Sequence, residues 1–323
     1  MVDIDRLISE SLKGDKRAVA RLISMVERGL ELTPYILEKI YPHSGSAYYI
    51  GVTGPPGSGK STTVDKLVKL FCNNRHSVGV IAVDPCSPFS GGALLGDRIR
   101  MNKRQKEWDV FFRSMSAGRV MGGLARTTKE TSRILDASGK QIIIIETVGV
   151  GQSELDIAQA TDTVIVILTP ESGDNVQLMK AGLIEIADLF VVNKADRPGA
   201  ENISLSIEAM LDRQRGRMEW KPPVILTSAS LDRGIDDLYE AIWRHSRYLK
   251  QDDKLKNRRK TQLKNELKQR IEGEILNVLW QKIHGNSVIN NLMDDIWEQR
   301  IDPQTAASQV VRNWLKDEIH GSL

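Results

Sequence analysis

The chain of 323 residues has only two cysteines, Cys72 and Cys86, so a disulfide framework is excluded and a reducing compartment is expected. No apolar run approaches the roughly 18 residues of a membrane-spanning helix. The first six residues include two acids, where a secretory signal peptide would be basic and then apolar. We therefore expect a cytoplasmic protein with no membrane partner.

An excess of one charge sign is also missing. The 45 basic and 42 acidic residues leave a formal net charge of +3, too small to indicate nucleic acid or a membrane surface as a partner. Internal repeats and low-complexity segments are absent as well. Hydrophobic residues make up 41%, as in ordinary globular proteins, and the length favours about two domains.

One glycine-rich stretch, residues 54–61, matches the phosphate-binding pattern G-x-x-x-x-G-K-[ST] at every fixed position. In such a loop, glycines let successive backbone N–H groups point at one anion. Lys60 is expected to reach the β- and γ-phosphates, and Ser61 to offer its hydroxyl to Mg²⁺. The predicted nucleotide contacts of this loop are Gly54, Gly57, Ser58, Gly59, Lys60, Ser61 and Thr62.

The apolar periodicity divides the chain into three parts. Residues 1–46 read as an N-terminal extension of two or three amphipathic helices, and residues 47–249 alternate apolar strands with helices. Near-continuous apolar runs suit strands covered on both faces, which predicts an α/β fold with a mostly parallel sheet flanked by helices. The expected strands are 48–52, 77–84, 109–115, 141–147, 163–170, 189–193 and 224–228.

Residues 250–323 read as a helical C-terminal arm. Lysine and arginine dominate 250–270, but leucine and isoleucine recur at helical spacing, which predicts a long helix with a solvated basic face. The more specific alternative is that this basic stretch is an arm that binds nucleic acid. Interspersed acids and the lack of interleaved aromatic residues count against it.

A guanine-binding motif follows one of the apolar strands. In Asn193-Lys194-Ala195-Asp196 a carboxylate can accept hydrogen bonds from N1–H and the exocyclic amine of guanine, a donor pair that adenine lacks. The stem of Lys194 can cover the base. A second contact to the base is expected after the last strand, from a backbone N–H among Ser228, Ala229 and Ser230.

The magnesium and γ-phosphate sensor is expected at the end of strand 141–147. Glu146 stands where GTPases usually have aspartate, and Gly149 can bring its N–H against the γ-phosphate. The following loop, 150–156, would relax after hydrolysis. Val150 occupies the place of the water-positioning glutamine of Ras-like GTPases, so we expect slow intrinsic hydrolysis, with Gln152, another loop or a partner completing the site.

Three further residues are weaker candidates. Asp84 ends a strand and is expected near the metal or the attacking water, and Asp97 is its runner-up, with a helix N-cap as the alternative role of Asp97. Lys180 follows the loop 171–175, a candidate third switch. The five histidines show no metal-ligand spacing and are expected to be solvated or in the core.

These motifs together resemble one family, the MeaB-type G-protein chaperones of adenosylcobalamin-dependent acyl-CoA mutases, also labelled ArgK or arginine/ornithine-transport ATPase. The string from Glu146 to Glu154 carries the resemblance most specifically. It implies a SIMIBI-class G domain, a homodimer made by the C-terminal arm, and a human counterpart that serves methylmalonyl-CoA mutase. Carried over, it places Ser61, Asp84, Asp97 and Glu146 around the metal and Lys180 in a third switch.

The resulting hypothesis is a GTPase that hydrolyses GTP to GDP and phosphate, with Mg²⁺, and gates cofactor loading, protection or repair of such a mutase. An ATP-dependent small-molecule kinase or transport ATPase is the first alternative. A metal-insertion GTPase is the second, although the scattered histidines count against it. A nucleic-acid-associated GTPase rests only on the basic face of 250–270.

Overall fold

The computed structural model describes residues 3–84, 108–116, 126–147, 156–172, 182–213, 219–284 and 288–320. Contacts between residues divide the chain into two compact units, residues 1–259 and 260–323. The first unit holds the sheet and the three N-terminal helices α1 (Ile4–Leu12), α2 (Lys16–Glu27) and α3 (Thr33–Ile40).

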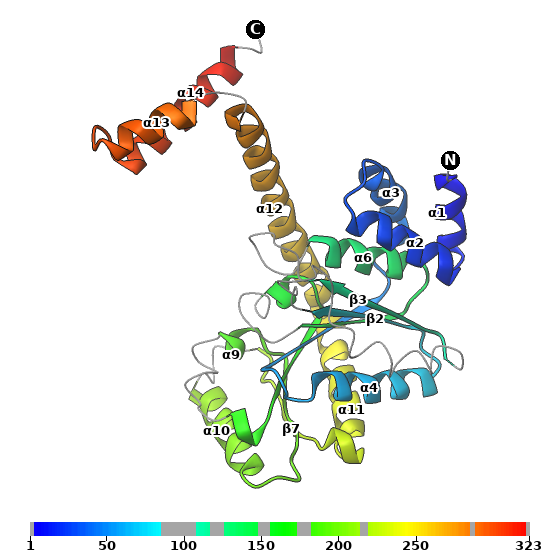
Figure 1. Cartoon of the computed structure of the whole chain (residues 1–323). Helices are drawn as coiled ribbons and strands as arrows, with labels where there is room; N and C mark the ends of the chain where they lie inside the picture. Colours follow the sequence, from blue (N-terminus) through cyan, green and yellow to red (C-terminus); the bar gives the residue numbers. More distant parts are fainter. Residues whose placement is uncertain are drawn as a thin grey trace. The chain divides into compact units, whose positions relative to one another are not determined.

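A seven-stranded parallel sheet organises the first unit (Figure 1). Its strand order is β3-β2-β4-β1-β5-β6-β7, so β1 lies at the centre. The strands are β1 (Tyr48–Thr53), β2 (Val78–Asp84), β3 (Val110–Ser116), β4 (Ile142–Glu146), β5 (Thr163–Leu168), β6 (Leu189–Val192) and β7 (Val224–Leu226). The predicted α/β fold with a P-loop and a mostly parallel sheet is confirmed.

Helices cover both faces of this sheet (Figure 1). Alternation along β4 shows why, because Ile142 and Ile144 enter one core while Ile143 and Ile145 enter the opposite one. The first core packs α4 (Lys60–Asn73) and α11 (Ile235–Lys250) against the sheet. On the other face, α1 to α3 and α6 (Arg126–Ala137) form one core, and α9 (Leu183–Ile186) and α10 (Ala200–Arg213) form another.

Short 3₁₀ helices connect several of these elements. They are η1 (Tyr41–His43), η2 (Ile157–Gln159), η3 (Pro170–Ser172), η4 (Ala229–Leu231) and η5 (Gln251–Asp253). One predicted boundary was wrong because of them, and another of them precedes the start of the long basic helix. The strand expected to reach Pro170 ends at Leu168, since the proline begins η3. The long basic helix begins at Lys254, because Asp252 and Asp253 have positive φ angles of 52° and 56°.

The second unit contains the rest of α12 (Lys254–His284), together with α13 (Val288–Trp297) and α14 (Pro303–His320). Asp302 caps α14 by accepting N–H bonds from Gln304 and Thr305, which matches the predicted start of a helix at Pro303. Among the described helices, none combines the length and apolar composition that crossing a bilayer requires.

Candidate nucleotide-binding site

The predicted phosphate and guanine motifs meet at the carboxyl edge of the sheet. The loop 54–59 joins β1 to α4, Glu146 ends β4, and residues 193–196 and 227–230 follow β6 and β7. Because all seven strands are parallel, these strand ends share one edge, where open α/β sheets bind ligands.

The phosphate loop is compact, and its lysine points back into it. Lys60 is buried, and its ammonium donates to the carbonyl oxygens of Gly54 at 2.8 Å and Pro55 at 3.0 Å. The hydroxyl of Ser58 is buried and has no hydrogen-bond partner among the described residues. A buried hydroxyl without a partner is costly in a finished core, so it fits a group that contacts a ligand.

The two predicted metal-binding groups with described side chains touch each other. Ser61 Oγ donates to Glu146 Oε1 at 2.6 Å. The register explains the approach, because Glu146 pairs with Val52 of β1, just before the loop that leads to Ser61. A hydroxyl in the first turn of α4 and a carboxylate oxygen at the end of β4 are the hard ligands that Mg²⁺ takes, so this pair fits such an ion.

Asn193 connects the phosphate loop to the loop after β7. Its Nδ2 donates to the carbonyl of Ser58 at 2.8 Å, and its Oδ1 accepts from Thr227 Oγ1 and from the N–H of Ala229, both at 3.1 Å. Gly59 makes this approach possible, since a Cβ there would lie 2.2 Å from Asn193 Nδ2. The sequence predicted Asn193 only as a reader of the base. No spacing pattern indicates its three bonds within the chain.

Asp196, the predicted guanine-reading carboxylate, lies beside Ser228. The Ser228 hydroxyl donates to Asp196 Oδ1 and lowers the pKa of this carboxyl group, with help from its own backbone N–H. An ionised carboxylate is the acceptor that N1–H and the guanine amine require. The N–H of Ser228 is used by the carbonyl of Arg233, and that of Ala229 by Asn193. An O6 contact from Ala229 would therefore share or replace its present bond.

Lys194 is held by a residue outside the predicted site. Glu171 in η3 accepts from Lys194 Nζ at 3.4 Å and from Arg197. The hydrogen bond from Arg197 lowers the pKa of Glu171 to about 2. Lys194 itself has a left-handed backbone, with φ of 57°. The sequence placed Glu171 only in a candidate switch loop, and its contact with the guanine motif depends on the tertiary fold.

Four predicted site residues, Asp97, Gly149, Gln152 and Lys180, lie outside the described residues. The backbone of Asp84 ends β2, two strands from β1, but its side chain also lies outside the description. Thr62 and Ser230 lie in α4 and η4, beside the residues described above.

A parallel sheet with a phosphate loop at its central strand and a guanine motif two strands away defines a P-loop GTPase. The family model described as "Methylmalonyl Co-A mutase-associated GTPase MeaB" matches residues 19–284. The chain belongs to this MeaB family, as the sequence motifs predicted. It is therefore a GTPase that binds guanine nucleotides.

Individual relatives and one solved structure match the chain over most of its length. A Pyrococcus abyssi protein is 44% identical over 326 residues, which are 99% of this chain and 98% of that protein. The mouse protein "Methylmalonic aciduria type A homolog, mitochondrial" is 34% identical over 279 residues, 81% of this chain and 67% of its own. The crystal structure of a protein titled "LAO/AO transport system kinase" superposes with a TM-score of 0.74 at 27% identity, covering 98% of this chain and 99% of that one.

Proposed function

We propose that this GTPase is a chaperone of an adenosylcobalamin-dependent acyl-CoA mutase of the methylmalonyl-CoA mutase type. In this role the GTP and GDP forms bind the mutase differently, and that difference gates cofactor loading, protection or repair. The names of the family and of the mouse relative support the choice of client. The geometry that supports its GTPase part is the Asn193 bridge, which joins the phosphate loop and the base-reading loop into one site.

The roles of the site residues follow from their positions. When Lys60 releases the carbonyl oxygens of Gly54 and Pro55, its ammonium group places a positive charge where the β- and γ-phosphates lie on the loop. Ser61 and Glu146 hold Mg²⁺, with Asp84 and Asp97 as further candidates. The ion, when bound, neutralises charge that develops on the phosphate oxygens as water displaces GDP from the γ-phosphorus. Asp196 reads the guanine edge, and Lys194 covers the base.

Nucleotide binding and turnover test the GTPase part of the proposal against the kinase alternative. GDP should bind much more tightly than ADP, and Lys60→Ala should abolish hydrolysis while leaving the circular dichroism spectrum unchanged. Equal affinities for GDP and ADP, or unchanged turnover in the variant, would contradict the site. Mutase rescue is the separate test of the client. Purified mutase should recover activity with this protein and GTP, and should not with GDP alone.

We also propose that the C-terminal arm forms a homodimer. Within the second unit, seven of the described large apolar side chains of α12 are more than two-fifths exposed, and four of them recur every four residues: Leu263, Leu267, Ile271 and Ile275. Their spacing of four residues places them on one helix face, as a helix–helix interface requires. Leu267→Glu should halve the mass measured by light scattering. Gln269→Glu, on another face of the same helix, is the matched control and should leave the dimer intact.

A further inference from the structure

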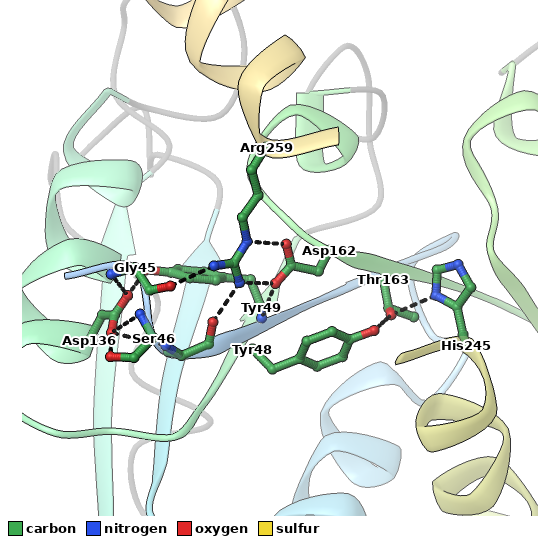
Figure 2. Close-up of polar contacts among 10 residues, drawn as sticks. Gly45, Ser46, Tyr48, Tyr49, Asp136, Asp162, Thr163, His245 and Arg259 are labelled. Atoms are coloured by element: carbon green, nitrogen blue, oxygen red, sulfur yellow. Dashed lines mark hydrogen bonds and ion pairs between the residues drawn. The ribbon is translucent and has the colours of Figure 1, made fainter. Parts of the chain in front are cut away.

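Arg259, in the second turn of α12, binds two separate segments of the first unit, residues 45–47 and Asp162 (Figure 2). Its Nε and Nη2 donate to both carboxylate oxygens of Asp162, at 2.9 and 2.6 Å. Its Nη1 and Nη2 also donate to the carbonyl oxygens of Gly45 and Ala47, each at 2.6 Å. Four directed bonds from one guanidinium hold residues 254–259, the part of this helix that belongs to the first unit.

The carbonyl partners are themselves held in place (Figure 2). Asp136, at the end of α6, accepts N–H bonds from residues 45–47 at 2.5 to 3.2 Å and the hydroxyl of Tyr49 at 2.6 Å. This short segment is therefore bound by Asp136 through its N–H groups and by Arg259 through its carbonyls. Arg259 contacts a surface that is already ordered.

Among the partners of Arg259, Asp162 is the one that lies close in sequence to the loop 150–156. Its side chain is 2% exposed, and it also accepts the N–H of Tyr49 at 2.9 Å. A buried carboxylate is strongly destabilised when its cation is removed, so Asp162 and Arg259 must move together. Asp162 directly precedes β5 and lies six residues after Asp156, the last residue of the loop 150–156 that is expected to relax after hydrolysis.

The residues between Asp156 and Asp162 pack tightly on the central strand. They form η2, whose Ile157 is fully buried and accepts the Thr161 hydroxyl at 2.8 Å. Gly51 of β1 creates the room for them, because a Cβ there would lie 2.6 Å from Ile157 Cγ1 and 2.8 Å from Thr161 Oγ1. Because this segment is closely packed on β1, residues 157–162 form a stiff connection. A displacement at Asp156 is transmitted to Asp162 with little rearrangement in between.

Arg258 offers a contrast within the same turn of helix. It donates to both carboxylate oxygens of Asp188, at 3.0 and 2.8 Å, and Asp188 also accepts the N–H of Val164 at 2.8 Å. Asp188 precedes β6 and follows α9, so it lies far along the chain from the loop 150–156. The two arginines thus make similar ion pairs, but only the pair of Arg259 includes a carboxylate of the segment 157–162.

We infer that the Asp162–Arg259 pair couples the nucleotide state to the start of the C-terminal helix, residues 254–259. Relaxation of the loop 150–156 after hydrolysis would move η2 against β1, shift Asp162 and so change how firmly Arg259 holds this turn. The inference rests on the proposed switch function. The nucleotide site lies at the carboxyl edge of the sheet, and Asp162 lies at the opposite, amino-terminal edge, directly before β5. The pair would therefore connect the nucleotide site with the start of the C-terminal arm across the sheet.

Hydrogen–deuterium exchange of the full-length protein tests this route. Peptides covering 254–263 are compared with GDP and with a non-hydrolysable GTP analogue. Wild-type protein should show at least a threefold difference in exchange rate between the two states. Arg259→Lys should reduce that difference below 1.5-fold, because lysine cannot satisfy Asp162 and both carbonyls together. Arg258→Lys, the matched control, should keep it.

A second variant guards against a folding defect in the first. Asp162→Asn keeps the shape and the acceptor for the Tyr49 N–H but removes the charge, and it should also abolish the difference. GDP affinity should stay within twofold of wild type in all three variants. Identical exchange in both states of wild-type protein that hydrolyses GTP would overturn the coupling and leave the GTPase standing. A difference that persists in both Arg259→Lys and Asp162→Asn would overturn it too.

Discussion

Asn193→Ala is the substitution with the clearest structural consequence for the site. Asn193 is 3% exposed and makes three hydrogen bonds, to Ser58, Thr227 and Ala229. Its loss leaves a carbonyl, a hydroxyl and an N–H without their partner in a buried place. Each such group costs about 1–3 kcal/mol before the neighbours relax. We expect the free energy of unfolding to fall by about 3 kcal/mol and GDP affinity to fall at least tenfold.

Urea unfolding of the nucleotide-free protein and titration with a fluorescent GDP measure these two effects. Asn193→Asp separates the bonds, because it keeps the acceptor for Thr227 and Ala229 but faces the Ser58 carbonyl with an oxygen. This variant should lose at least as much GDP affinity as the alanine variant. Asn202→Ala, on the exposed face of α10, is the control and should change stability by less than about 0.5 kcal/mol. A stability loss as small as the control's, with unchanged GDP affinity, would refute the bridging role.

Three further outcomes are expected. Gly54→Ala should lose nucleotide binding and at least about 3 kcal/mol of stability, because a Cβ would lie 2.0 Å from the Ile167 carbonyl oxygen at a φ of 139°; a normally folded variant in thermal unfolding would argue against this. Asp196→Asn should lower GDP affinity about 100-fold and admit xanthine nucleotides in competition assays, since the amide offers a donor to the base; an unaltered base preference would discredit the guanine contact. Burial lowers the pKa of His245 from 6.5 to about 4, although Asp188 opposes the shift. The unfolded chain therefore binds a proton that the folded chain excludes, and stability should fall as pH falls from 6.5 towards 4, by on the order of 3 kcal/mol. His245→Gln should flatten that part of the pH profile in urea unfolding, and an unchanged slope would contradict the assignment.

The buried network around His245 could not be read from the sequence. His245 Nδ1 lies 2.8 Å from Thr163 Oγ1, which in turn lies 2.5 Å from the hydroxyl of Tyr48 (Figure 2). The three residues come from α11, β5 and β1. The sequence predicted only that the histidines are solvated or in the core, because one histidine at a helical position carries no pattern that identifies its partners.

The fold class, the base and the phosphate loop were predictable from the order of residues. Apolar runs such as 142–145 require burial on both faces, and the fixed spacing of Lys60 and Ser61 and the Asn193–Asp196 string name the chemistry. Such signals lie within short stretches of the chain, so they can be recognised without a three-dimensional structure. The tertiary structure alone decided which of these groups meet. Ser61 reaches Glu146 across 85 residues, Asn193 reaches Ser58 across 135, and Arg259 reaches Asp162 across 97. Contacts of this range depend on strand order and register, which place distant side chains together and leave no periodic trace in the sequence.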